Sequence, residues 1–488
     1  MPNIVYILAD DMGYGDVRCL NENGKIPTPH MDRLAAEGMT FTDAHSGSAV
    51  CTPTRYGFLT GRYAWRTRLA RGVLMGYSAP LIAPGRMTVA SFLKSHGYAT
   101  AGFGKWHLGL GLPTTDGKPA EGDGSNVDFA KPIANGPTSL GFDTYYGISA
   151  SLDMPPYVYI DNDKFAGVPT TTRKYIREGL ATEDFEAVDV LPKITAKAVE
   201  YIEARAKAGA AGAKPTPFFL YLPLNAPHTP IAPTKEFQGK SGLNDYGDFV
   251  MQVDDTVGQV LGALDRAGLA DDTLVIVTSD NGCSPQADFE LLASKGHDPS
   301  YVFRGMKADI FEGGHHIPFI ARWPGRVKAD STSDQVICLT DLLATCADIL
   351  GQKLPDDAGE DSVSILPVLE GRTRTPLGGA RDKPLREGTV HHSVNGSFSI
   401  RRGKWKLELC PGSGGWSPPK PKSDAARKLP PVQLYDLSAD IGEQSNLQGE
   451  HPDVVAELTK LLQSYADRGR STPGRPQKND RDVSITRQ

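Results

Sequence analysis

The sequence predicts an α/β fold with a mostly parallel central sheet, and three observations lead to this prediction. Short apolar runs recur along the first two thirds of the chain, as buried parallel strands require. Segments with apolar residues at helical spacing lie between these runs, where the crossover helices that connect parallel strands are expected. The chain has 488 residues, which is enough for one large domain and a smaller one.

The predicted strands are residues 4–9, 98–103, 218–222 and 274–278. A first helix is expected after Thr28, because Pro29 suits the first helical turn and Gly38 suits the end of a helix. Residues 249–267 carry valine and leucine at helical spacing and predict a longer helix with one apolar face. Strands and helices in this order indicate a layered α/β domain.

A change of pattern predicts a second unit near the C-terminus. Residues 351–385 are rich in Pro, Gly and Asp, and strand-like segments follow at residues 397–400 and 405–410. We predict a large α/β domain over residues 1–370 and a C-terminal subdomain over residues 371–488. Further predictions are a helix at residues 452–466, an exposed loop at 204–217 and a loosely held tail at 470–488.

Composition excludes several classes of protein. The formal net charge of −6 gives no general attraction to nucleic acid, and no apolar run approaches the roughly 20 residues that span a bilayer. The six cysteines are scattered, unlike those of a disulfide scaffold. An apolar run begins almost at Met1, so we expect either a cytoplasmic protein or one whose export signal has been removed.

Acidic and amide residues follow two of the predicted strands. Asp10 and Asp11 come directly after the first strand, and Asp280 and Asn281 come just after the strand at residues 274–278. Taken alone, either pair is more typical of residues that cap the helix or turn that follows them. Ligand sites of parallel sheets lie at the carboxyl ends of the strands, where both pairs are expected. Together they favour a site for a hard divalent cation.

A segment around Cys51 carries a family resemblance. Residues 51–55 read C-T-P-T-R and residues 59–62 read L-T-G-R. This resembles the signature of type I sulfatases, with Thr54 in place of the commoner serine. Three further elements are similar to those of the family: G-K-W-H-L-G at 104–109, N-A-P-H-T-P at 225–230, and R-G-M-K at 304–307 leading into F-E-G-G at 311–314.

The resemblance implies an alkaline phosphatase-like fold, with helices on both faces of the main sheet and a small C-terminal antiparallel sheet with a helix. It implies that a formylglycine-generating or anaerobic sulfatase-maturing enzyme oxidises Cys51 to formylglycine (3-oxoalanine). The implied metal is Ca²⁺, with Mg²⁺ as the alternative, and its ligands are Asp10, Asp11, position 51, Asp280 and Asn281. The implied location is periplasmic or secreted, with a cytoplasmic location as the alternative.

The same resemblance implies roles for other residues. Arg55 would hold the aldehyde hydrate, and His107 would take a proton from its second hydroxyl. His228 and Lys307 would stabilise the leaving alcohol. The residues expected to contact sulfate or substrate are Lys105, Ser151, His228, His297, Arg304 and Lys307.

The expected substrate is a sulfated mono-, oligo- or polysaccharide. Residues 296–300, G-H-D-P-S, look like those of bacterial carbohydrate sulfatases and favour a galactose or N-acetylgalactosamine type of sulfate. The loops at residues 152–174 and 283–304 carry Tyr157, Tyr159 and Tyr301, whose faces would suit a sugar ring. The alternatives are a phosphonate monoester or phosphodiester hydrolase and a glycan-binding pseudoenzyme. Lys105, His107 and Lys307 favour the sulfatase over the first.

Overall fold

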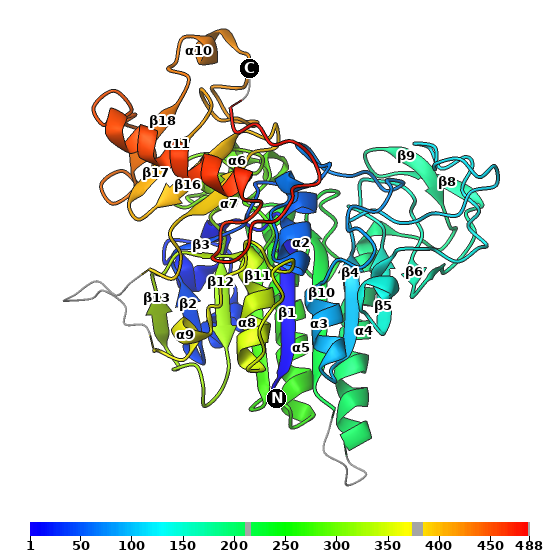
Figure 1. The fold of residues 1–488 in the computed structure, drawn as a ribbon. Helices are drawn as coiled ribbons and strands as arrows, with labels where there is room; N and C mark the ends of the chain where they lie inside the picture. The colour runs from blue at the N-terminus through cyan, green and yellow to red at the C-terminus, as the bar shows by residue number, and fades with distance from the viewer. Residues whose placement is uncertain (210–215, 373–383, 487–488) are drawn as a thin grey trace.

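The structure is a computed structural model, and it describes residues 1–209, 216–372 and 384–486 (Figure 1). Its main feature is a mixed sheet with a parallel centre. In spatial order the strands are β13 (Ser331–Ser333), β2 (Met39–Phe41), β12 (Phe319–Arg322), β11 (Thr273–Ser279), β1 (Asn3–Asp10), β10 (Phe218–Pro227), β4 (Ala99–Lys105), β5 (Thr144–Ile148), β6 (Ile160–Asp161) and β7 (Lys164–Phe165). The pairs β11/β1, β1/β10, β10/β4 and β4/β5 are parallel.

Helices cover both faces of this sheet, because alternate side chains of each strand point to opposite faces. In β1, Ile4, Tyr6 and Leu8 join the core under α2, α3, α8 and α9, whereas Val5 and Ile7 join the core under α1, α4 and α5. The helices are α1 (Pro29–Ala36), α2 (Cys51–Thr60), α3 (Val89–Ser95), α4 (Ala187–Gly209), α5 (Asp245–Arg266), α6 (Phe289–Ser294), α7 (Glu312–His315), α8 (Leu342–Ile349), α9 (Leu366–Leu369), α10 (Asp424–Arg427) and α11 (Pro452–Asp467).

These elements confirm the predicted fold class and the four predicted strands, which are β1, β4, β10 and β11. The predicted helices near Thr28 and at residues 249–267 are α1 and α5. Helix α5 begins earlier than expected, at Asp245, because the Asn244 side chain accepts a hydrogen bond from the Gly247 amide and caps the helix. Strand β10 runs on to Pro227, past its apolar run.

A four-stranded antiparallel sheet forms near the C-terminus, from β15 (Thr389–His392), β16 (Phe398–Arg402), β17 (Trp405–Glu408) and β18 (Gln433–Asp436). The predicted terminal helix is α11, and its Leu458, Leu462 and Tyr465 pack with Ile400 and Leu407 of the sheet. Figure 1 shows both above the large sheet, on the side of α2. The domain boundary at residue 370 stays a prediction.

Smaller strand pairs complete the described fold. Strands β3 (Ala44–His45) and β14 (Ile337–Cys338) are parallel, and β8 (Thr171–Lys174) and β9 (Glu178–Ala181) are antiparallel. Among the described residues, no helix combines the length and the apolar character that crossing a membrane requires.

Two predictions about exposed segments are wrong. Residues 204–209 are the last turns of α4 rather than a loop, because alanine, arginine and lysine favour helix without needing burial. Residues 210–215 lie outside the described residues. The tail is not loosely held either: Ile485 is buried, Asp480 pairs with Arg62, and Asn479 accepts a hydrogen bond from Arg66. Buried arginines give this polar tail fixed partners.

Replacing Arg66 with methionine is expected to destabilise the fold by about 3–5 kcal/mol, because it leaves the Asp361 carboxylate buried without its cation. Both side chains are fully buried, and Arg66 donates to the two Asp361 oxygens at 2.8 and 2.7 Å. Urea unfolding measures the change. The control is Arg68→Met, since exposed Arg68 donates to two backbone carbonyls and has no carboxylate partner among the described residues. Equal small losses from both variants would contradict the expectation.

Candidate active site

Four neighbouring strands of the large sheet end in polar residues. Asp10 is the last residue of β1 and Lys105 is the last residue of β4, while His228 directly follows β10 and Asp280 directly follows β11. These strands are parallel neighbours in the order β11, β1, β10, β4, so their carboxyl ends lie at one edge of the sheet. The fold thereby gathers residues that are far apart in the sequence.

Cys51 faces this edge as the first residue of α2. Its sulfur and side-chain atoms of Asp10, Asp11 and His228 lie within 4.8 Å of one another. Position 51 therefore lies at the N-terminus of a helix, which favours negative charge. Burial raises the pKa of the Cys51 thiol to about 12, so the unmodified thiol is a weak nucleophile at neutral pH.

The carboxylates of the site are paired with buried cations. Lys105 Nζ lies 2.6 Å from Asp10 Oδ2, and Lys307 Nζ lies 2.6 Å from Asp11 Oδ2. Arg55 donates from Nε and Nη2 to Asp280 Oδ2, at 3.0 and 2.8 Å. These six groups carry three negative and three positive charges, so their net charge is zero when all are ionised.

Burial acts differently on the two outer carboxylates. For Asp10, burial alone would raise the pKa, but Lys105, His228 and Arg55 hold it well below its usual value. For Asp280, burial and the nearby Asp10 carboxylate raise the pKa to about 6, despite Arg55. Added positive charge at this edge would favour the ionised form of both groups.

The residues fit a hard divalent cation. Asp10 Oδ1 and Asn281 Oδ1 are buried and have no hydrogen-bond partner among the described residues. The Asn281 amide is oriented by its Nδ2, which donates to Asp11 Oδ1 at 2.7 Å. Buried oxygens without partners are rare, and carboxylate and amide oxygens are the ligands that Ca²⁺ and Mg²⁺ prefer. The chemistry of the donor set therefore matches the predicted metal.

His107 lies where the backbone turns after β4, and its φ angle is 56°. Its Nε2 bonds the Leu74 carbonyl at 2.7 Å, and its Nδ1 is buried without a partner in the described structure. Burial, together with the Lys105 charge, holds the pKa of His107 well below its usual value. The side chain is therefore a neutral imidazole with one unused nitrogen, which suits a proton acceptor.

The other residues expected to bind sulfate occupy buried positions near strand ends. The pKa of His228 is lowered by burial and by the Lys307 charge, and its Nε2 lies 3.6 Å from Asp11 Oδ2. Ser151 is buried, and its hydroxyl has no hydrogen-bond partner among the described residues. Asn225 of β10 and Ser149 share this property and were not predicted. Asn225 belongs to the same N-A-P-H-T-P motif as His228, so its position in the sequence could have identified it as a site residue.

His297 and Arg304 are occupied elsewhere. Both ring nitrogens of buried His297 are bonded, Nε2 to Asp16 at 2.9 Å and Nδ1 to the Lys25 amide at 3.2 Å. The Arg304 guanidinium stacks over Phe311 at 3.9 Å and donates to a backbone carbonyl of the C-terminal region at 2.6 Å. Among the described residues, neither side chain forms a hydrogen bond or an ion pair with Asp10, Asp11 or Asp280.

The prediction that Tyr157 and Tyr159 offer their faces to a sugar is wrong. They are only 1% and 4% exposed, and both rings pack against Phe185. The apolar surroundings of their loop bury them in the core beside α4. Tyr301 differs, since it is 38% exposed.

Comparison with known proteins identifies the family of this chain. The model of the Sulfatase family matches residues 2–352. An N-acetylgalactosamine-6-O-sulfatase of Bacteroides thetaiotaomicron is 36% identical, over 96% of this chain and 93% of that protein. The chain therefore belongs to the Sulfatase family and is an enzyme of that class, a sulfuric ester hydrolase.

Two further relatives cover almost the whole chain. Human arylsulfatase A is 32% identical, over 94% of this chain and 87% of that protein. A solved structure of a 6S-sulfatase, described under the metabolism of multiple glycosaminoglycans by Bacteroides thetaiotaomicron, is 34% identical with a TM-score of 0.80. It covers 95% of this chain and 98% of its own chain.

Proposed function

We propose that this enzyme removes sulfate from a sulfated carbohydrate, with formylglycine at position 51 and Ca²⁺ bound by Asp10, Asp11, Asp280 and Asn281. The main support is that Cys51 lies at the N-terminus of α2, within 4.8 Å of two carboxylates at the edge of the sheet. A buried thiol with a pKa of about 12 is a poor nucleophile. The hydrated aldehyde supplies a hydroxyl to attack sulfur and a second one whose deprotonation releases the sulfate.

Charge supports a metal ion at this place. The three carboxylates and the three cations of the site cancel, so a divalent ion would give it two positive charges. That charge matches an anionic sulfate ester. Bound Ca²⁺ would lower the pKa of the attacking hydroxyl and polarise the sulfate oxygens. The unpartnered oxygens of Asp10 and Asn281 are the positions that such an ion would satisfy.

The chain's own residues then have separate tasks. Arg55, fixed by Asp280, orients the side chain at position 51, and Lys105 and Lys307 bind sulfate oxygens. His228 and Lys307 stabilise the leaving alcohol. His107 accepts a proton at its unpartnered Nδ1, while the Leu74 carbonyl holds its Nε2.

Ser151 is a further sulfate-binding group in this proposal, because its buried hydroxyl lacks a partner within the described structure. His297 has both nitrogens engaged with Asp16 and the Lys25 amide, so we assign it to the support of the site. Asp16 accepts a hydrogen bond from Tyr246, whose hydroxyl also lies 3.3 Å from the Asp11 carbonyl.

The proposed substrate carries sulfate on O6 of N-acetylgalactosamine or galactose. The Bacteroides relative, which is named for N-acetylgalactosamine-6-O-sulfate, aligns over 96% of this chain. Oxidation of Cys51 requires a second protein as partner, a formylglycine-generating or anaerobic sulfatase-maturing enzyme. We place the enzyme in the periplasm or outside the cell, because sulfated glycans are anionic and do not cross a bilayer unaided.

Sulfate release from a panel of sugars tests the substrate. The panel contains N-acetylgalactosamine with sulfate on O4 or O6, galactose 6-sulfate, N-acetylglucosamine 6-sulfate and a phosphodiester. We expect kcat/KM for the O6-sulfated galacto sugars to exceed that for the other sugars by about 10²-fold, since buried polar groups reject a misplaced substituent. Preference for the O4 isomer would refute the sugar assignment, and preference for the phosphodiester would refute the reaction.

A further inference from the structure

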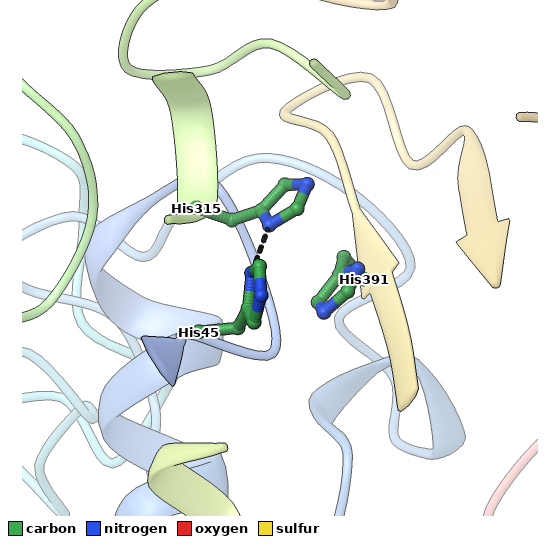
Figure 2. A group of neighbouring side chains, drawn as sticks. All are labelled: His45, His315 and His391. Carbon is green, nitrogen blue, oxygen red and sulfur yellow. Dashed lines mark hydrogen bonds between the residues drawn. The ribbon is translucent and has the colours of Figure 1, made fainter. Parts of the chain in front are cut away.

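Three buried histidines gather outside the active site, between the large sheet and the C-terminal sheet. His45 comes from β3, His315 from α7 and His391 from β15, and Figure 2 shows their rings side by side. Each is fully buried, and one nitrogen from each ring lies within 4.8 Å of the others. Sequence inspection gives no sign of this cluster, because hundreds of residues separate His45 from the other two.

Each ring has a hydrogen-bond partner for its outer nitrogen. The partners are the Asp43 carboxylate for His45 Nε2 at 2.7 Å, the Ile310 carbonyl for His315 Nε2 at 3.1 Å and the Ser399 hydroxyl for His391 Nδ1 at 3.3 Å. Metal-binding histidines have such partners on the nitrogen that does not bind the metal. The remaining nitrogens, Nδ1 of His45, Nδ1 of His315 and Nε2 of His391, are therefore the ones that could bind an ion at the centre of the cluster.

The protons on the outer nitrogens decide whether the inner nitrogens can bond one another. When the outer nitrogens of His45 and His315 donate to their acceptors, both neutral rings carry a lone pair on Nδ1, and these atoms are only 3.1 Å apart. His391 Nε2 is buried without a hydrogen-bond partner in the described structure. Two facing lone pairs and one unpartnered nitrogen are unfavourable unless a cation lies between them.

We propose that His45, His315 and His391 form a second metal site, for a zinc-class divalent ion. Imidazole nitrogens suit zinc, whereas the oxygen donors of the active site suit calcium, so the two sites select different ions. The rival arrangements are direct hydrogen bonds. Lys406 Nζ lies 3.2 Å from His315 Nε2, and donation there would move the His315 proton to Nδ1 and toward His45. Arg401 Nη1 lies 3.2 Å from His45 Nε2, and donation there would move the His45 proton to Nδ1 and toward His315. Either arrangement leaves His391 Nε2 without a hydrogen-bond partner among the described residues.

The proposed ion would hold the segment that leads to position 51. His45 lies shortly before Cys51, and the intervening Ser48 and Ala49 both donate hydrogen bonds to the carbonyl of His392, at 3.1 and 3.0 Å. His392 is the neighbour of His391 on β15. An ion shared by His45 and His391 would therefore tie the same two segments together, and its role is structural rather than catalytic.

The test is metal binding by tag-free protein. Wild type and His391→Gln are stripped with a chelator, incubated with zinc in the presence of excess calcium, freed of unbound metal and analysed by mass spectrometry for zinc. We expect about one zinc per wild-type chain, a higher thermal midpoint with zinc, and neither effect in the variant. His316→Gln is the matched control, since both nitrogens of buried His316 are already bonded, to Glu312 and to the Thr42 carbonyl at 2.8 Å each.

Several outcomes would overturn the site. Wild type without zinc would refute the site and leave the direct hydrogen bonds from Lys406 or Arg401 as the explanation, and equal zinc in His391→Gln would place the ion elsewhere. Loss of zinc only in His316→Gln would favour the neighbouring group of Asp43, His45 and His316. If His391→Gln does not fold, anomalous scattering at the zinc edge from wild-type crystals decides, because a peak among the three rings supports the site and its absence refutes it. None of these readouts depends on sulfatase activity.

Discussion

Replacing Cys51 with alanine is expected to lower the rate of sulfate release by about 10⁴-fold or more, while the protein stays folded. Cys51 is the residue at the N-terminus of α2 that faces the carboxylate cluster, and alanine cannot be converted to an aldehyde. Lys105, Lys307 and Arg55 remain to bind the sulfate ester, so binding should persist when turnover is lost. Turnover and ligand binding are measured on the same preparation.

The matched control is Cys346→Ala. Cys346 is as fully buried as Cys51, but it lies in α8 within the apolar core. Its replacement should cost about 1 kcal/mol of stability and leave kcat unchanged. Peptide mass spectrometry should find the aldehyde at position 51 of active wild type and an intact thiol at Cys346. Turnover by Cys51→Ala near the wild-type level would refute the proposed nucleophile.

The sequence allows the central part of the fold to be predicted, because its signals there are local. Strands buried on both faces are continuous apolar runs, and this property identifies β1 and β11 without any knowledge of their neighbours. Asp10 and Asp280 directly follow such runs, so the rule for parallel sheets was enough to expect them at one edge. The family resemblance added Cys51, Lys105 and Lys307, which lie in the same cluster in the structure.

Other features depend on distant partners and leave no local signal. The polar tail after residue 470 reads as loosely held, yet buried Arg62 and Arg66 bind its Asp480 and Asn479. Tyr157 reads as a loop aromatic available to a sugar, yet it is covered by Phe185 of the segment before α4. Charge pairing and aromatic packing between segments decide such positions, and one sequence does not contain the distances that they require.

Replacing Asp280 with asparagine is expected to weaken calcium binding and to lower kcat/KM by about 10³-fold. The change keeps the shape of the side chain but removes the negative charge that both Arg55 and the proposed ion share. It also leaves Arg55, which is fully buried, without its main partner, so the side chain at position 51 loses its orientation. Calorimetric titration with calcium and steady-state kinetics at saturating calcium measure the two effects.

Asp361→Asn separates this metal effect from simple destabilisation. Asp361 is as buried as Asp280 and is likewise bound by one arginine, since Arg66 donates to its oxygens at 2.8 and 2.7 Å. Its replacement should lower the thermal midpoint while calcium affinity and kcat stay close to wild type, because this pair joins α11 and the tail to the large domain. Equal losses of calcium affinity in both variants would mean that folding alone explains them, and unchanged affinity in Asp280→Asn would remove Asp280 from the proposed ligands.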